Sequence, residues 1–129
     1  MKEGIRILTK GKILVVDDEI RLCSIMEELL CKRGYDARSV YSGTEAIELI
    51  KKEEFDLVLC DYVMPEITGY DVAILLNVLE KKPKVGIITG ERDLIGVKER
   101  EDMKIDFIVE KPVNYSELTK LINDTLEAL

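Results

Sequence analysis

The chain alternates between short apolar runs and amphipathic segments. Four apolar runs lie at residues 13–16, 57–60, 85–88 and 107–110, and residues 36–40 form a shorter, more polar candidate strand. Nearly all-apolar strands are typical of a sheet that helices cover on both faces. Alternation of such strands with helices predicts βαβ units, and right-handed crossovers restrict these units to a doubly wound sheet. We therefore predict an α/β fold with five parallel strands and five helices.

Three of the expected helices begin at a capping residue that is followed three positions later by an acidic residue: Ser42 with Glu45, Thr68 with Asp71, and Asn114 with Glu117. Such pairs satisfy the free N–H groups of a first helical turn. The first helix should follow Asp18 and end at Gly34, the second should extend to about residue 52, and Pro83 should end the third. Residues 93–102 form the weakest helical segment, because they are mostly charged and interrupted by Gly96.

Apolar residues at helical spacing define the face of each helix that should pack on the sheet. They are Leu22, Met26 and Leu29 in the first helix, Ala46, Leu49 and Ile50 in the second, Val72, Leu75, Leu76 and Leu79 in the third, and Leu118, Leu121, Ile122 and Leu126 in the last.

The length of 129 residues, 47% of them hydrophobic, predicts one domain that can bury a core. We interpret residues 1–11 as an N-terminal tail of unknown role and residues 12–129 as the domain. No apolar run approaches the roughly 18 residues of a membrane span, and no signal-peptide pattern opens the chain. The net charge of -7 argues against direct nucleic-acid binding, because the phosphate backbone would repel this segment.

Histidine is absent, which excludes Ser-His and Cys-His nucleophile pairs and most zinc sites. The three cysteines, Cys23, Cys31 and Cys60, lack metal-ligand spacing, and we interpret them as reduced thiols of a cytoplasmic protein. Any phosphate chemistry in this chain must therefore use carboxylates.

Polar residues follow four of the predicted strands: Asp17 and Asp18 after the first, Asp61 after the third, Thr89 after the fourth and Lys111 after the fifth. The carboxyl ends of parallel strands share one edge of the sheet, where open α/β sheets bind their ligands. Three carboxylates suit a divalent metal such as Mg²⁺, and a hydroxyl and an ammonium suit a phosphoryl group. We therefore expect a site for both at this edge.

Each of these residues also has an ordinary structural interpretation. The acidic pair could favour a helix N-terminus, Asp61 could precede a turn, Thr89-Gly90 could be a turn, and Lys111 could be a surface lysine before a proline. Their joint occurrence at four strand ends favours the site.

The set Asp17-Asp18, Asp61 with Met64-Pro65 and Gly69, Thr89-Gly90 and Lys111-Pro112 closely resembles the receiver domain of two-component response regulators. The resemblance covers residues 12–129 and implies a flavodoxin-like fold with strand order 2-1-3-4-5. It also implies that Asp61 accepts phosphate, that Thr89 and Lys111 contact the phosphoryl group, and that the Lys111–Pro112 bond is cis. Mg²⁺ would be bound by Asp18, Asp61 and the backbone carbonyl of Val63, with Asp17 acting through water.

The implied partner is a histidine kinase or a histidine phosphotransfer protein, docked near Ile20, Ser24 and Val113. By the same resemblance the domain is a monomer or a phosphorylation-dependent dimer. It would phosphorylate and dephosphorylate itself at Asp61 with Mg²⁺, and would not be a turnover enzyme. The usual switch pairs the threonine, here Thr89, with an aromatic residue on the fifth strand. Ile108 stands in that place, and Phe107 should point to the opposite face of the sheet.

Two other functions are compatible with parts of this pattern. A haloacid-dehalogenase-like phosphatase also uses a strand-end aspartate, but it needs an Asp-x-Asp spacing that Asp17-Asp18-Glu19 lacks. A pseudo-receiver that acts only as an interaction module usually loses the acidic pair or the lysine, and both are present here.

Overall fold

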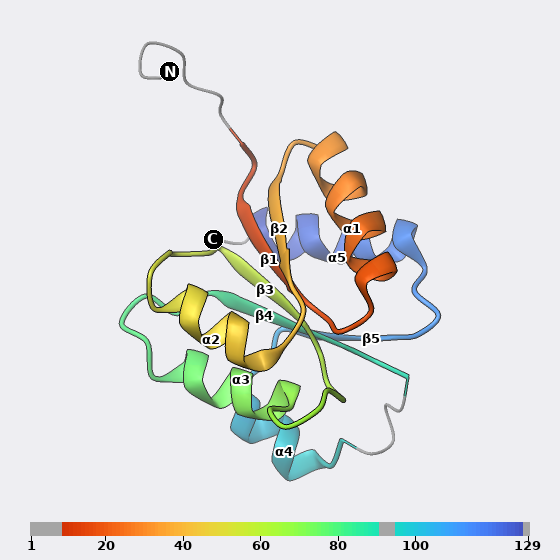
Figure 1. Ribbon diagram of the computed structural model, residues 1–129. Helices are drawn as coiled ribbons and strands as arrows, with labels where there is room; N and C mark the ends of the chain where they lie inside the picture. The colour runs from red at the N-terminus through yellow and green to blue at the C-terminus, as the bar shows by residue number, and fades with distance from the viewer. Residues whose placement is uncertain (1–8, 91–94, 128–129) are drawn as a thin grey trace.

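The computed structural model describes residues 9–90 and 95–127, which form a three-layer α/β fold with the sheet in the middle (Figure 1). In chain order the elements are β1 (Lys12–Val16), α1 (Ile20–Lys32), β2 (Asp36–Val40), α2 (Gly43–Ile50), β3 (Leu57–Asp61), α3 (Gly69–Asn77), β4 (Lys84–Thr89), α4 (Val97–Met103), β5 (Phe107–Glu110) and α5 (Tyr115–Glu127). All neighbouring strands are parallel, and their order is β2-β1-β3-β4-β5. The predicted fold class and strand order are confirmed.

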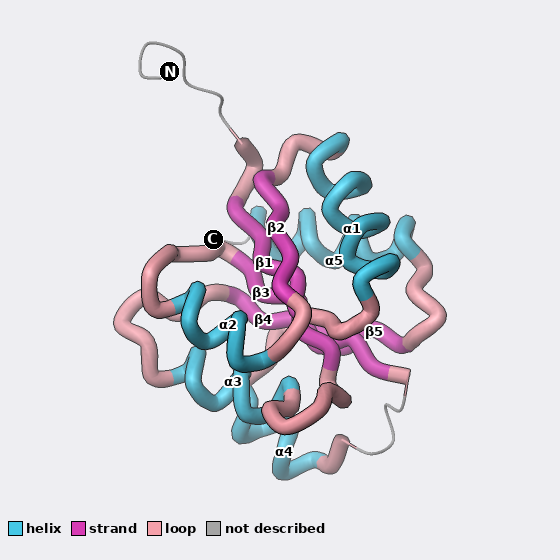
Figure 2. The backbone as a smooth tube through the Cα atoms, in the orientation of Figure 1, coloured by secondary structure: helices cyan, strands magenta, loops and turns pink. Residues whose placement is uncertain are grey.

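The helices divide between the two faces of the sheet. Helices α1 and α5 lie on one side, and α2, α3 and α4 lie on the other (Figures 1 and 2). Each face carries its own buried apolar cluster, one under α1 and α5 and one under α2 to α4. β1, β3 and β4 supply residues to both clusters, which explains why their sequences are almost entirely apolar.

The predicted caps are present at three helices: Ser42 Oγ accepts from Glu45 N at 3.1 Å, Thr68 Oγ1 from Asp71 N at 3.3 Å, and Asn114 Oδ1 from Glu117 N at 3.1 Å. Gly34, with φ of 96°, follows the end of α1, as expected for a glycine that stops a helix.

The inward face of α1 differs from the prediction. The buried residues are Cys23, Met26 and Leu30, whereas Leu22 and Leu29 are half-buried at the side. Sequence hydrophobicity favoured the two leucines over a cysteine, but the Cys23 thiol faces inward and donates to the carbonyl oxygen of Asp17 at 3.3 Å.

Helix ends were predicted less well than helix starts. α3 ends at Asn77, six residues before Pro83, where the Asn77 amide donates to the carbonyl oxygens of Asp102 and Met103, each at 3.0 Å. Leu79 therefore lies beyond the helix and Leu75 is only half-buried, while Ala73 is buried instead. Helix α2 ends at Ile50 and not at residue 52, and its Leu49 is half-buried.

The fourth helix is shorter than predicted and begins later. Gly96 is its N-cap and not an interruption, and the helix continues to Met103. Residues 93 and 94 of the predicted segment lie outside the described residues, as do residues 1–8 of the predicted tail. In α5, Leu121 is half-buried, and Thr119 is buried beside Leu118, Ile122 and Leu126.

Strand β5 directs its first two side chains, Phe107 and Ile108, to opposite layers, as predicted. Ile108 packs against the α2–α4 cluster, and Phe107 packs against the α1–α5 cluster. The Phe107 ring occupies the space beside Gly86 of β4, where an added Cβ atom would overlap the ring. The missing side chain at Gly86 thus makes room for the aromatic residue of the neighbouring strand.

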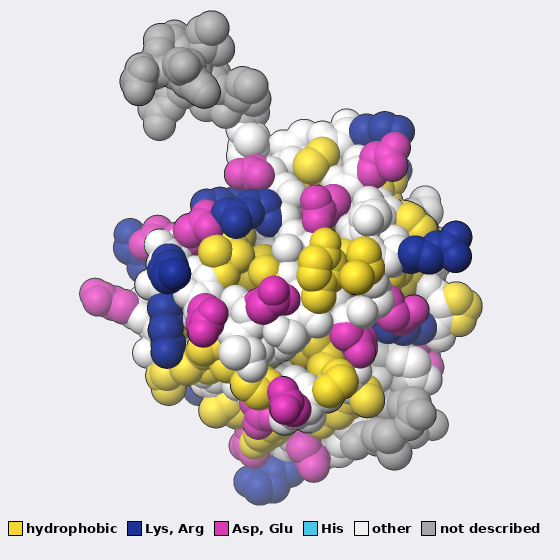
Figure 3. Space-filling model, in the orientation of Figure 1, with side chains coloured by type: hydrophobic (Ala, Val, Ile, Leu, Met, Phe, Trp, Pro, Cys, Tyr) yellow, Lys and Arg dark blue, Asp and Glu magenta, His cyan; other side chains and the backbone are white. Residues whose placement is uncertain are grey.

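The surface is mixed in charge. On the face shown in Figure 3, acidic and basic side chains are interspersed with small apolar areas. Among the described residues, no helix is both long and apolar enough to cross a membrane.

Candidate functional site

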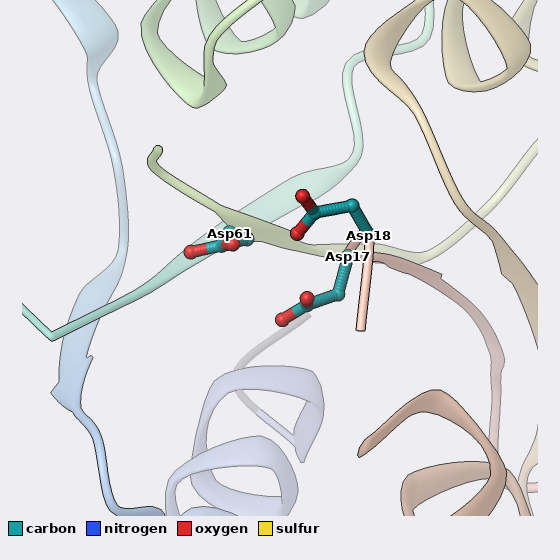
Figure 4. Close-up of side chains that lie close together, drawn as sticks. All are labelled: Asp17, Asp18 and Asp61. Carbon is teal, nitrogen blue, oxygen red and sulfur yellow. The ribbon is translucent and has the colours of Figure 1, made fainter. Parts of the chain in front are cut away.

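Three carboxylates meet at the carboxyl ends of β1 and β3. Asp17 and Asp18 follow the last residue of β1, and Asp61 is the last residue of β3. One oxygen from each of the three side chains lies within 4.8 Å of the others. Figure 4 shows the three side chains lying close together at this sheet edge. The edge is the one at which parallel α/β sheets bind ligands.

Asp17 is buried, and one of its two carboxylate oxygens forms an ion pair but accepts no hydrogen bond among the described residues. Its Oδ1 accepts a hydrogen bond from Glu19 N at 2.8 Å, which holds the loop after β1. Its Oδ2 accepts no hydrogen bond from the described residues, although Lys111 Nζ lies 3.3 Å away. Burial raises the pKa of Asp17 above its ordinary value, and the Glu19 N–H and Lys111 offset only part of this effect.

Asp61 is also buried and carries the second perturbed carboxylate. Burial, together with the charge of Asp17, raises its pKa to about 6, against the opposing charge of Lys111. Lys111 Nζ lies 3.5 Å from Asp61 Oδ2. Clustered, desolvated carboxylates of this kind repel one another and favour a bound cation.

Lys111 enters the site from the end of β5. Its backbone N–H donates to the carbonyl oxygen of Thr89 at 2.9 Å, so the buried end of β4 holds the start of the Lys111 loop. The Lys111–Pro112 peptide is cis, as the resemblance implied. Burial alone would lower the pKa of Lys111, but the hydrogen bond to Glu19 and the charges of Asp61 and Asp17 outweigh it and raise the pKa above its ordinary value.

The loop after Asp61 is fixed by backbone contacts. Tyr62 N donates to the carbonyl oxygen of Ile88 at 3.0 Å, and Gly69 N donates to that of Tyr62 at 2.9 Å. Within the loop Met64 is buried, whereas Val63 has 57% of its surface exposed. The loop is thus anchored at both ends, and Val63 lies on its exposed part.

The donor set fits a hard divalent cation. All three side chains offer oxygen, two of the three carboxylates are buried, and Asp17 Oδ2 lacks a hydrogen-bond donor among the described residues. Mg²⁺ prefers oxygen ligands and usually keeps several waters, so a few carboxylates suffice. Asp17, Asp18 and Asp61 could therefore hold such an ion.

The structure brings most of the sequence-predicted residues to one edge and leaves others outside. Asp17, Asp18, Asp61 and Lys111 cluster, and Thr89 ends the strand next to Asp61. Of the predicted docking residues, Ile20 and Ser24 are exposed on α1, and Val113 is half-buried against the α1–α5 cluster.

Sequence reasoning missed Glu19. Its Oε1 accepts a hydrogen bond from Lys111 Nζ at 2.7 Å, the shortest of the three distances from Lys111 Nζ to a carboxylate oxygen. The available signal was that Glu19 continues the acidic pair, which gives three successive carboxylates in the loop after β1.

Comparison with known proteins identifies the family. Residues 13–123 match the sequence profile of the response regulator receiver domain. The transcriptional regulatory protein ZraR of Salmonella typhimurium is 30% identical over 122 residues, which cover 92% of this chain but only 27% of ZraR. Sporulation initiation phosphotransferase F of Bacillus subtilis is 27% identical over 115 residues, covering 89% of this chain and 93% of that protein.

Solved structures agree with this match. The response regulator TrrA of Thermotoga maritima, in complex with Mg²⁺-BeF, has a TM-score of 0.80 and 29% identity, covering 88% of this chain and 97% of TrrA. A response regulator receiver domain protein of Methanospirillum hungatei has a TM-score of 0.85 and 26% identity, covering 91% of this chain and 94% of that one. With the profile match spanning most of its length, the chain belongs to the response regulator receiver domain family, the phosphoacceptor signalling domains of two-component systems.

Proposed function

We propose that Asp61 is the phosphoacceptor of this receiver domain, that residues 12–129 form the domain, and that the donor is a histidine kinase or a histidine phosphotransfer protein. The main support is the position of Asp61 at a buried strand end. Its side chain lies beside two other carboxylates, with Lys111 Nζ 3.5 Å away. This arrangement places a nucleophile, oxygen ligands and a cation in one crevice.

The proposed phosphoryl transfer is a displacement at phosphorus. An Asp61 carboxylate oxygen forms a bond to phosphorus while the bond from phosphorus to the donor histidine nitrogen breaks, and the nitrogen keeps the electron pair. Water later cleaves the acyl phosphate, which regenerates the carboxylate and releases inorganic phosphate. Phosphoryl transfer of this kind needs mainly positioning and charge neutralisation, so a site built from oxygen ligands and one lysine is sufficient.

The other site residues take supporting roles in this proposal. Asp18, Asp61 and the Val63 carbonyl would hold Mg²⁺ directly, with Asp17 acting through water; the bound cation would neutralise charge on the phosphoryl oxygens. Lys111 would pair with the phosphoryl group, and the Thr89 hydroxyl would donate a hydrogen bond to it. The related response regulator TrrA was solved in complex with Mg²⁺-BeF, which supports the proposal that this domain binds Mg²⁺.

We propose that the domain acts in the cytoplasm and does not bind nucleic acid directly. Three free thiols fit a reducing compartment, and a net charge of -7 supports the absence of direct nucleic-acid contact by this segment. The chain spans 27% of the length of ZraR, so output functions of such relatives are not carried over. We propose a monomer or a dimer that forms on phosphorylation.

The partner is expected to dock beside the crevice on α1 and the loop after Lys111. Ile20 has 60% of its surface exposed there, and Ser24 lies one turn further along. Alanine at Ile20 or Ser24, or at Val113, should slow transfer from the kinase but not labelling by a small donor. Equal slowing of both reactions would assign these residues to support of the site instead.

Labelling with a small acyl phosphate tests the acceptor. With Mg²⁺ the wild type should gain one phosphoryl group by mass spectrometry, Asp61→Asn should gain none, and Asp124→Asn, on the exposed side of α5, should behave as wild type. Stoichiometric labelling of Asp61→Asn would overturn the assignment. Continuous turnover of a small phosphate ester would instead indicate a phosphatase.

A further inference from the structure

Glu19 connects two loops that lie far apart in the sequence. Its Oε1 lies 2.7 Å from Lys111 Nζ, compared with 3.3 Å for Asp17 Oδ2 and 3.5 Å for Asp61 Oδ2. The pair joins the loop after β1 to the loop after β5, 92 residues later. In the absence of a phosphoryl group, the Lys111 ammonium therefore lies closest to Glu19, a carboxylate outside the cluster of Asp17, Asp18 and Asp61.

The position of Glu19 in the fold makes this contact notable. Glu19 is the N-cap residue of α1, where a side-chain oxygen usually accepts from the free N–H groups of the first turn. Its side chain makes no such cap, and the first turn of α1 carries no other acidic residue. The carboxylate is turned away from the positive end of the helix and toward Lys111, although both could attract it.

The ion pair between Glu19 and Lys111 is weak enough to break when Asp61 is phosphorylated. The side chain of Glu19 has 62% of its surface exposed and that of Lys111 has 22%, so water screens the pair from the Glu19 side. A phosphoryl group on Asp61 would bring roughly two negative charges close to Lys111, in a more buried position. The lysine would then exchange a single exposed carboxylate for a stronger and less screened anion.

We propose that Glu19 is a positioning residue, which holds Lys111 at the edge of the crevice and competes with the phosphorylated acceptor for it. This inference rests on the proposed role of Asp61. The proposal predicts that Glu19 slows phosphorylation. Lys111 must give up its contact with Glu19 before it can pair with the incoming phosphoryl group, and this loss offsets part of the new attraction.

Three variants, assayed with a small acyl phosphate at saturating Mg²⁺, test this competition. Glu19→Gln removes the charge at nearly constant size and should raise the rate of labelling about two- to fivefold, the range expected for breaking an exposed ion pair. Glu19→Asp keeps the charge but is one methylene shorter, so it should also label faster than wild type. Glu28→Gln removes the same charge from α1 at an exposed pair with Lys32, and should label as wild type.

A second measurement reports the contact itself. In the unphosphorylated, metal-free protein, the NMR signals of the Lys111 side chain should shift in Glu19→Gln and Glu19→Asp but not in Glu28→Gln. An unchanged or lower labelling rate in Glu19→Gln, or equal acceleration in Glu28→Gln, would overturn the competition while leaving Asp61 as acceptor. A wild type that is not labelled at all would overturn the proposed function and this inference together.

Discussion

Gly69 at the start of α3 lies directly against the backbone of Asp61. A Cβ atom on residue 69 would stand 2.7 Å from the carbonyl oxygen of Asp61 and 2.8 Å from the Cα atom of Tyr62. Both are backbone atoms at the end of a buried strand, so they cannot swing aside as the tip of a side chain could. The close approach lets the loop after Asp61 turn back into the helix.

Gly69→Ala should therefore disturb the acceptor loop. Overpacking of this kind costs about 1–3 kcal/mol, although alanine is the better helix former, and the displaced loop should slow labelling of Asp61. Urea unfolding and acyl-phosphate labelling measure the two effects. Gly90→Ala is the matched control, because no described residue lies within 4 Å of its added Cβ, and it should change stability by less than about 0.5 kcal/mol. If Gly69→Ala has the stability and the labelling rate of the wild type, the loop after Asp61 can move to accept the added Cβ atom, and this prediction is wrong.

The stability of the metal-free protein should depend on pH through Asp61. Burial and the charge of Asp17 raise its pKa from 3.8 to about 6, so the folded state binds this proton more tightly than the unfolded chain does. The contribution of Asp61 should therefore become less favourable as the pH rises from about 4 to about 6. Asp61→Asn should match wild type near pH 4 and exceed it above pH 6, by on the order of 2 kcal/mol.

Urea unfolding of both proteins in a chelator, at several pH values, measures that difference. Acidic groups distant from Asp61 titrate in both proteins and largely cancel in the comparison. A difference that stays constant between pH 4 and pH 7 would contradict the raised pKa.

Mg²⁺ should stabilise the wild type by relieving repulsion among Asp17, Asp18 and Asp61. Mass action gives about 2.7 kcal/mol at a hundredfold excess over the dissociation constant, visible as a higher Tm. The gain should vanish in Asp18→Ala, which removes one proposed ligand from an exposed position and leaves the two buried carboxylates. Phosphorylation of the wild type without any thermal shift at millimolar Mg²⁺ would rule out the metal assignment.

Phosphorylation should change α4 more than β5. Ile108, the residue predicted at the switch position with Thr89, is stiff at χ1 and too small to alternate between two aromatic positions. α4 is short and buries only Met103, and weakly packed elements are the ones that open readily. Hydrogen exchange with and without an acyl-phosphate mimic should show changes in residues 90–103, of which 91–94 lie outside the described part, and little at Phe107 and Ile108. Changes confined to β5 would refute this prediction.

The strands and the starts of the three capped helices could be predicted because local signals determine them. Strand β5 matched its prediction residue by residue, and the Ser42, Thr68 and Asn114 caps formed as expected, since each depends on a partner three residues away. Helix ends depend on distant contacts. α3 stops at Asn77, whose amide donates to the carbonyl oxygens of the last two residues of α4, and nothing near Asn77 in the sequence signals those partners.

The same distinction applies to the site. The meeting of Asp17, Asp18, Asp61 and Lys111 followed from strand ends and parallel topology, which the apolar runs reveal. The Glu19–Lys111 contact could not be foreseen, because it depends on how two loops 92 residues apart approach each other. A negatively charged side chain at a helix N-terminus is ordinarily expected to interact with the positive end of its own helix.

Because Phe107 packs over Gly86, the residue types that are tolerated at these two positions of neighbouring strands depend on each other. A side chain can be added at position 86 only if the ring at position 107 shifts or is replaced, so a change such as Phe107→Leu should compensate for Gly86→Ala. Either substitution alone should be harmful, one through overlap and the other through an unfilled space, whereas the pair together should restore much of the loss. Among sequences related to this chain, the two positions are therefore expected to vary together, with glycine at the first accompanying an aromatic residue at the second.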